Sequence, residues 1–233
     1  MVYLIPSLLH ESAFSTLPPA ILDAVLDCQV FFVENERSAR RFLKSIRKEL
    51  VIDSYEWVLA DKDTTGLPET RQQFIKAIQE GKNIGIISEA GCPGVADPGQ
   101  PLVALAHEKG VTVKPVTGPS SILLALMASG LNGQRFTFNG YLPIDTGHRI
   151  KLLRELEERS AKEHCTQVFM ETPYRNTALL ETVIKACRPE TLLCIAANLT
   201  APDEFISTLP LSAWAKKKPD LHKKPALFLL LAK

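Results

Sequence analysis

The feature that most constrains the fold is a regular alternation, in the first half of the chain, of short apolar runs with longer amphipathic stretches. The apolar runs are rich in β-branched and aromatic residues, which is typical of strands, and the stretches between them have helical periodicity. Strands are predicted over 2–6, 29–34, 51–55, 83–88 and 111–116, with helices over 18–27, 35–48, 67–81 and 100–109. This rhythm predicts an α/β fold with a mainly parallel sheet.

The second half has a different pattern. Strands are predicted over 135–143, 166–172, 192–200, 204–210 and 226–233, with helices over 122–130, near 148–162 and near 174–187. The turn composition Ala201-Pro202-Asp203 between two of these strands predicts an antiparallel hairpin. We therefore expect two α/β domains: residues 1–116 with a mainly parallel sheet, and residues 117–233 with a mixed sheet.

Composition excludes several classes of protein. The 233 residues are 45% hydrophobic and carry a net charge of +1, so the chain can bury a sizeable core but has no strong overall field for nucleic acid. Five cysteines without a C-x-x-C pair argue against a disulfide framework and a zinc site, and favour a reducing cytoplasm. The cysteine pattern leads us to expect no metal. No basic leader and no membrane-length apolar stretch are present, so we expect a soluble protein.

One loop stands out, SEAGCPGVADPGQP at 88–101, between a predicted strand and a predicted helix. Its glycines, Gly91, Gly94 and Gly99, match neither the dinucleotide fingerprint nor the P-loop. Two interpretations stay open. The small residues let backbone approach a ligand, since such loops are frequent ligand sites in α/β sheets, or they only shape a tight connection.

Five motifs occur in a familiar order: VENERSARRFL (33–43), SEAGCPGVADPG (88–99), PVTGPSS (115–121), NGYLP (139–143) and METPYR (170–175). With them the chain resembles the class III, or tetrapyrrole methylase-like, S-adenosylmethionine-dependent methyltransferases. Within that family it resembles the ribosomal RNA small-subunit methyltransferase I branch, which methylates a cytidine ribose 2′-hydroxyl. The resemblance spans almost the whole chain. It implies a cofactor cleft between two α/β domains, usually in a homodimer.

Carried over by position, the resemblance implies a set of residues that bind S-adenosylmethionine. They are Ser88, Glu89, Ala90, Gly91, Pro93, Ser120, Ser121, Met170, Glu171, Thr172, Asn198 and Leu199. Ser120 and Ser121 open a predicted helix, whose unpaired N–H groups suit a carboxylate, although plain N-capping explains them equally well. The backbone of 170–172 is expected to contact adenosine.

The candidates on the acceptor side are less well defined. Glu34 and Arg37 are the predicted catalytic residues, with the alternative that they form an i,i+3 ion pair. His10, Arg40, Arg41 and Arg175 are predicted to bind substrate. Arg175 could instead pair with Glu171 at a helix start.

Three segments depart from the family pattern. Residues 6–11 lack the glycine of the family's TPIGN-like loop, and ENER at 34–37 replaces EDTR. ANLTA at 197–201 lacks both basic residues of the branch's RELTK. Acceptor recognition is therefore expected to differ from that of the usual branch member.

Three functions stay open. The first is a methyltransferase acting on ribosomal RNA or the small ribosomal subunit, supported by basic runs at 44–48 and 216–224, which could also be solvated faces. The second is methylation of a small tetrapyrrole-like metabolite. The third is a noncatalytic relative that binds the cofactor only.

Overall fold

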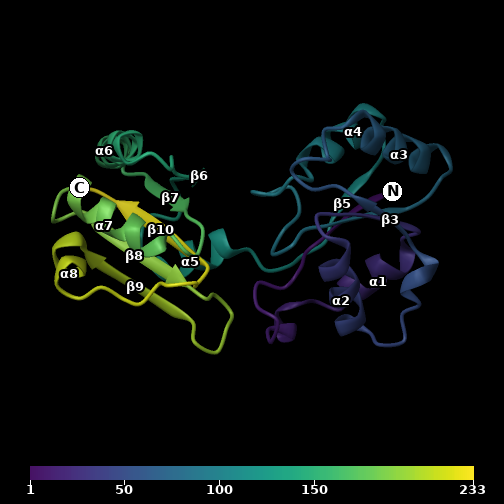
Figure 1. Cartoon of the computed structure of the whole chain (residues 1–233), viewed down its shortest axis with the longest axis horizontal. Helices are drawn as coiled ribbons and strands as arrows, with labels where there is room; N and C mark the ends of the chain where they lie inside the picture. The colour runs from purple at the N-terminus through teal and green to yellow at the C-terminus, as the bar shows by residue number, and fades with distance from the viewer. The chain divides into compact units, whose positions relative to one another are not determined.

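The computed structural model describes residues 1–233, which fold into two compact units, unit 1 (Met1–Ser120) and unit 2 (Ser121–Lys233). Each unit contains one five-stranded sheet (Figure 1). The division after Ser120 lies a few residues beyond the predicted boundary at residues 116 and 117.

The sheet of unit 1 is entirely parallel. Its strands β1 (Val2–Ile5), β2 (Val30–Val33), β3 (Glu56–Leu59), β4 (Ile84–Ile87) and β5 (Val113–Pro115) lie in the order β3-β2-β4-β1-β5. The expectation of a parallel sheet is confirmed. The predicted strand at 51–55 is wrong, because Ile52–Ser54 forms a 3-10 turn, η2, and the strand begins at Glu56. The Ser54 N–H and hydroxyl both bond the Val51 carbonyl, which closes this turn.

Helices cover both faces of this sheet, α1 (Ala20–Asp27) and α2 (Glu36–Ile46) on one and α3 (Pro68–Gln79) and α4 (Gln100–Glu108) on the other (Figure 1). A short turn, η1 (Phe14–Thr16), precedes α1. Alternate strand residues point to opposite faces, so Tyr3 and Ile5 pack with α1 and α2, while Val2 packs with α3 and α4. Strands buried on both sides explain the continuous apolar runs of the sequence.

The sheet of unit 2 is mixed, as predicted. Its strands β6 (Phe136–Tyr141), β7 (Thr166–Met170), β8 (Leu192–Ala197), β9 (Phe205–Pro210) and β10 (Ala226–Leu231) lie in the order β6-β7-β10-β8-β9. β6 and β7 are parallel, β8 and β9 form the predicted hairpin, and β10 runs antiparallel to both of its neighbours.

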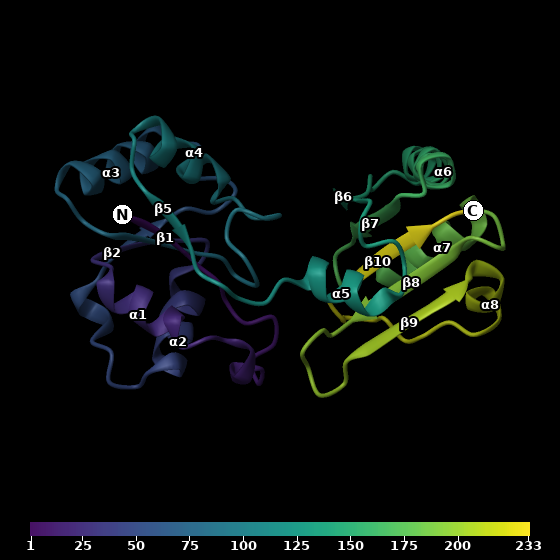
Figure 2. The same ribbon diagram turned by 180° about the vertical axis from the view of Figure 1, so that it is seen from behind.

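Three helices, α6 (Thr146–Glu163), α7 (Asn176–Ala186) and α8 (Leu211–Lys216), pack on one face of this sheet around Phe169 and Phe228. α5 (Ser121–Ser129) contacts β8, β9 and β10 (Figure 2). The Asp145 side chain caps α6 by accepting the His148 N–H. No helix in either unit has the length and apolar character that crossing a bilayer requires.

Candidate functional site

Most of the predicted residues of unit 1 lie at one edge of its sheet. All five strands run in the same direction, so the segments that come after β1, β2, β4 and β5 emerge at the same edge. These segments carry His10, Glu34, the 88–93 motif and Ser120. The carboxyl edge of a parallel sheet is where ligands of open α/β folds bind.

Backbone hydrogen bonds join two of these segments. The Ser7 N–H donates to the Gly91 carbonyl at 2.9 Å, and the Gly91 N–H donates to the Ser7 carbonyl at 3.2 Å. The buried Ser7 hydroxyl donates to the Ser88 carbonyl at 2.6 Å, and the Ser88 hydroxyl donates to the Gly91 carbonyl at 2.9 Å. The Ser88 hydroxyl, predicted to bind cofactor, is thus engaged in the fold of the loop itself.

Gly91 meets two requirements at once. Its φ of +72° is unfavourable for other residues, and an added Cβ would lie 3.3 Å from Leu9 Cδ2 and 3.4 Å from the Pro119 carbonyl. The segments after β1, β4 and β5 therefore meet at this glycine. The positive φ accounts for the glycine without any ligand.

Asp97 organises the rest of the loop. Its Oδ1 accepts the N–H of Gly94 and the N–H of Gly99, both at 2.8 Å, just before α4 begins. The turn-shaping interpretation of the glycines and Asp97 thus has direct support. Glu89 and Ala90, by contrast, are exposed and are in a position to contact a ligand.

A groove of about 620 Å³ lies beside this loop in unit 1. Its walls are the segment 7–12, one face of α2 and the start of the 88–101 loop. It brings together four of the predicted residues, His10, Arg41, Ser88 and Glu89. The volume is within the range of small-molecule sites, roughly 300–1,000 Å³.

Glu34 and Glu89 are linked in this region. Glu34 Oε2 accepts the Glu89 N–H at 2.9 Å, and a Glu89 carboxylate oxygen accepts the Ser38 hydroxyl of α2. Partial burial raises the pKa of the Glu34 carboxyl, the neighbouring carboxylates of Asp97 and Glu89 raise it further, and the Glu89 N–H opposes them. No ion pair joins Glu34 to the exposed Arg37, so the predicted structural pair does not form. A raised pKa suits a proton acceptor working near neutral pH.

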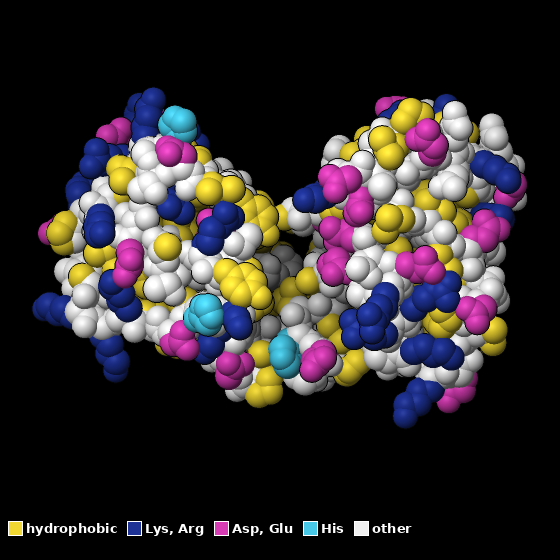
Figure 3. Space-filling view, viewed as in Figure 1, with side chains coloured by type: hydrophobic (Ala, Val, Ile, Leu, Met, Phe, Trp, Pro, Cys, Tyr) yellow, Lys and Arg dark blue, Asp and Glu magenta, His cyan; other side chains and the backbone are white.

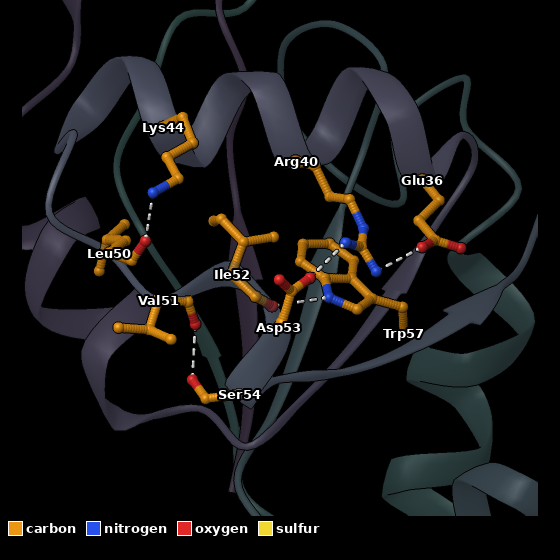
Figure 4. A network of polar contacts seen from close by, with 9 residues as sticks. All are labelled: Glu36, Arg40, Lys44, Leu50, Val51, Ile52, Asp53, Ser54 and Trp57. Carbon is orange, nitrogen blue, oxygen red and sulfur yellow. Dashed lines mark hydrogen bonds and ion pairs between the residues drawn. The ribbon is translucent and has the colours of Figure 1, made fainter.

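The cations of α2 divide into two groups. Arg40 is paired with Glu36 at 2.7 Å and with Asp53 at 2.9 Å, and its guanidinium lies 5.1 Å from the centre of the Trp57 ring (Figure 4). Lys44 Nζ donates to the carbonyls of Leu50 and Lys48. These contacts hold the segment 48–57 against α2. Arg41 lines the groove instead, and Figure 3 shows several Lys and Arg side chains over α2.

The predicted residues of unit 2 gather at one end of the mixed sheet. β10 pairs Leu227 with Met170 of β7 and Ala226 with Ala197 of β8. The segments 170–172 and 198–199 therefore leave the sheet at the same end, on either side of β10. Ser121 is the first residue of α5, and Ser120 is the last residue of unit 1.

Glu171 is a buried anion in this group, 4% exposed. Its Oε1 accepts Arg175 Nη2 and the Thr172 N–H, each at 2.7 Å, and Arg149 Nη1 lies 3.8 Å from its Oε2. The predicted alternative for Arg175, a structural pair with Glu171, is therefore present. Sequence reasoning missed Arg149, because its place on the charged helix α6 gives no sign of burial.

Asn198 holds the other side of this end of the sheet. It has a φ of +50°, its Nδ2 donates to Asp203 Oδ2 at 2.8 Å, and its N–H donates to the Pro225 carbonyl at 2.9 Å. Leu199 is buried. The ANLTA segment thus contacts the chain just before β10.

The residues offer no metal centre. No three His, Cys, Asp or Glu side chains are grouped so that they could hold a metal ion, and all five cysteines are free.

Solved structures share the fold. The chain superposes on the methyltransferase CobJ with a TM-score of 0.65 and 16% identity, over 99% of this chain and 93% of that one. For the uroporphyrin-III C-methyltransferase of Thermus thermophilus, solved with S-adenosyl homocysteine, the TM-score is 0.60 and the identity 19%, over 99% and 96% of the two chains.

Two curated relatives have higher sequence identity to this chain than these solved structures. The chain is 38% identical over 147 residues to a protein of Mesorhizobium japonicum named ribosomal RNA small subunit methyltransferase I. The aligned residues make up 63% of this chain and 49% of that protein. The chain thus matches about half of that relative's length. A protein of Vibrio cholerae with the same name is 28% identical over 99% of this chain and 76% of its own. The family model of the tetrapyrrole (corrin/porphyrin) methylases matches residues 15–214, and the chain belongs to this family.

Proposed function

We propose that this protein is an S-adenosylmethionine-dependent methyltransferase that methylates a cytidine ribose 2′-hydroxyl of small-subunit ribosomal RNA. The names of its relatives in Mesorhizobium japonicum and Vibrio cholerae support the substrate, and the S-adenosyl homocysteine bound to the Thermus thermophilus enzyme supports the donor. Family membership across residues 15–214 supports the reaction class.

The observation that carries the proposal is the groove of unit 1, where Ser88 and Glu89, predicted on the donor side, share walls with His10 and Arg41, predicted on the acceptor side. The residues fit a nucleoside. One carboxylate oxygen of Glu89 accepts the hydrogen bond from the Ser38 hydroxyl. The other oxygen can therefore accept a hydrogen bond from a ribose hydroxyl. Donor and acceptor bound here would be held close together, and much of the acceleration of a displacement comes from positioning.

When bound, S-adenosylmethionine supplies a methyl group on a sulfonium. In the proposed reaction a C–S bond breaks, a bond forms between the methyl carbon and the ribose oxygen, and the hydroxyl proton needs an acceptor. We assign that acceptor to Glu34, which accepts the N–H of the groove residue Glu89 and whose raised pKa favours proton uptake. Arg37 and Arg41 would contact RNA phosphates, and Arg40 would act only by positioning α2.

The unit 2 residues Met170–Thr172, Asn198 and Leu199, with Ser120 and Ser121, belong to the same proposal as further donor contacts. A homodimer is also proposed, from the resemblance and from exposed apolar side chains such as Met127 and Ile144. An enzyme of ribosomal subunits would act in the cytoplasm.

One experiment tests the substrate. Small ribosomal subunits from a strain that lacks this gene are incubated with the purified protein and methyl-labelled donor, and ribose methylation is mapped. We expect one methylated cytidine, and we expect loss of transfer in Glu34→Gln with the donor affinity retained in calorimetry. Transfer to a tetrapyrrole and not to subunits would favour the alternative metabolite substrate. Donor binding without any transfer would favour a noncatalytic relative.

The cations of α2 allow a sharper test. Arg41→Gln should flatten the log–log dependence of RNA affinity on salt by about 0.7 for each lost phosphate contact to a single strand. Arg40→Gln should lower stability instead, because Arg40 is engaged with Glu36, Asp53 and Trp57. Equal slopes in Arg41→Gln and the wild type would remove Arg41 from the RNA site.

A further inference from the structure

The branch's two basic residues are absent from 197–201, yet the structure places other cations beside that segment. The run 216–224, KKKPDLHKK, holds five lysines against one aspartate and leads into β10. Because β10 lies between β7 and β8, this run reaches the end of the sheet where the segments after β7 and β8 emerge.

Four contacts fix the position of this run. The Lys223 N–H donates to the Pro173 carbonyl at 3.2 Å, and Asn176 Nδ2 donates to the Lys224 carbonyl at 2.7 Å. The Asn198 N–H donates to the Pro225 carbonyl at 2.9 Å, and Lys224 Nζ lies 3.7 Å from Asp203 Oδ2. Lys223 and Lys224, at the end of the run, are therefore anchored between the METPYR and ANLTA segments.

An exposed aromatic ring lies among these cations. Tyr174 is 72% exposed. Lys223 Nζ lies over its ring, 5.9 Å from the centre, and the His222 ring meets it edge-on at 6.2 Å. A ring with this exposure is accessible to a flat partner, and the cation beside it can meet an anionic group of that partner.

The carboxylates near the ring are engaged by other groups. Asp220 Oδ1 accepts the His222 N–H, Asp203 is shared by Asn198 and Lys224, and Glu171 is buried under Arg175. Lys223 has no carboxylate within ion-pair distance. An exposed aromatic ring next to a cation without a carboxylate partner is the combination that binds single-stranded nucleic acid, where bases stack and phosphates meet lysines.

We propose that Tyr174, His222, Lys223 and Lys224, here called the Tyr174 patch, bind a single-stranded segment of RNA, with a base on Tyr174 and phosphates on the two lysines. The inference rests on the proposed function and deepens it. Lys223 and Lys224 precede β10 and lie beside the segment 197–201. They supply the positive charge that the sequence of this segment lacks.

The test uses the full chain and a fluorescent 12-nucleotide single-stranded RNA of mixed sequence. Tyr174→Ala should weaken binding at least about fivefold, because stacking on an aromatic side chain contributes about 1–3 kcal/mol per base. Tyr174→Phe should bind within about twofold of the wild type, since the π-face is retained. Lys223→Gln should flatten the log–log salt dependence by about 0.7.

The matched control is Lys185→Gln, an exposed lysine in the last turn of α7, whose first turn lies next to Tyr174. It should leave both affinity and salt slope unchanged. A duplex of the same RNA is a second control, because its stacked bases cannot reach the ring. Lys223→Gln should weaken duplex binding, and Tyr174→Ala should not.

Unchanged affinity in Tyr174→Ala, or an equal loss in Lys185→Gln, would overturn the patch. Equal binding of polyglutamate, with the same sensitivity to Lys223→Gln, would assign it to an acidic peptide and would also overturn it. Donor calorimetry and transfer to ribosomal subunits, measured on the same variants, keep the two proposals apart. If subunits are methylated and the patch variants behave like wild type, only the patch fails. If the wild type binds no RNA and methylates no subunits, both fail.

Discussion

The two units gather their candidate residues by different means. In unit 1 every strand runs in the same direction, so the segments after β1, β2, β4 and β5 emerge at one edge. In unit 2 the antiparallel strand β10 lies between β7 and β8, so the residues that precede β10 join those that come after its neighbours. A parallel sheet thus gathers the segments C-terminal to its strands, and an antiparallel strand adds its own N-terminal segment to them.

The two sites also differ in the interactions that hold them together. In unit 1, backbone hydrogen bonds and small residues join the segments, as at Ser7, Gly91 and Gly118. In unit 2, the buried carboxylate of Glu171 is paired with Arg149 and Arg175. We therefore expect loss of charge to be most damaging in unit 2 and added volume to be most damaging in unit 1.

The largest effect is expected for Glu171→Ala. Removing a buried carboxylate leaves its arginine partners without their counter-charge and costs about 3–5 kcal/mol. We expect the lower part of that range, because the Arg175 side chain is 36% exposed and can regain water. Urea unfolding measures the change. Glu163→Ala is the control, since its ion pair with Arg135 is exposed and should contribute less than about 1 kcal/mol. Equal losses of unfolding free energy in the two variants would contradict the view that the buried ion pairs of Glu171 stabilise this site in unit 2.

The next largest effect is expected for Gly118→Ala. The added Cβ would lie 2.2 Å from Pro6 Cβ, so the segments after β1 and β5 must separate. Overpacking of this kind costs about 1–3 kcal/mol. Gly66→Ala is the matched control in the same unit, because its added Cβ would have nothing within 4 Å. Thermal unfolding should show a lower Tm for Gly118→Ala only. If both variants unfold at the same temperature, the close approach does not matter for stability.

Asp97→Ala should have a smaller effect, about 1–2 kcal/mol, because two backbone N–H groups lose their acceptor. Asp97→Asn keeps Oδ1 and should lose less. Hydrogen exchange at the amides of Gly94 and Gly99 reports the loss directly, and both should exchange faster in Asp97→Ala. Unchanged exchange there would mean that the rest of the loop holds these groups.

The smallest effect concerns Glu34 and depends on pH. Burial raises the pKa of its carboxyl in the folded state, so the folded protein holds this proton more tightly than the unfolded chain. The resulting stability is present below the carboxyl's ordinary pKa and is lost as pH rises through the raised one. As pH rises from acid to neutral, the free energy of unfolding of Glu34→Gln should therefore increase relative to that of the wild type. Urea unfolding at several pH values measures this difference. A difference that stays constant or shrinks with rising pH would contradict the raised pKa.

Much of the fold could be predicted from local patterns. The strands and helices of unit 1 agree with the apolar and amphipathic alternation, and the turn at 201–203 indicated the β8–β9 hairpin. The prediction of a strand at 51–55 was wrong because Val51, Ile52 and Tyr55 have strand propensity, whereas local hydrogen bonds close Ile52–Ser54 into a turn. Propensity is weaker than such contacts over so few residues.

The candidate site could be predicted only in outline. The family resemblance implies that Ser88–Gly91, Met170–Thr172 and Asn198 bind one ligand, and the sheet topologies bring the residues of each unit to a single edge or end. The partners of these residues were not predictable. Arg149 gave no signal on a charged helix, and the basic run 216–224 was better explained by its sequence as a solvated face, because Pro219 and Asp220 interrupt the charge.

The sequence by itself determined the class of fold, the order of the strands along the chain and the family, because hydrophobic periodicity and motif spacing are properties of neighbouring residues. Only the tertiary structure decided which cations pair with which anions and which stay available. Arg40 and Arg41 are adjacent in sequence, yet one is bound to Glu36 and Asp53 and the other lines the groove. The physical reason is distance along the chain. The bond from Ser7 to Ser88 joins residues 81 positions apart, and the contact of Lys223 with Tyr174 depends on where β10 enters the sheet.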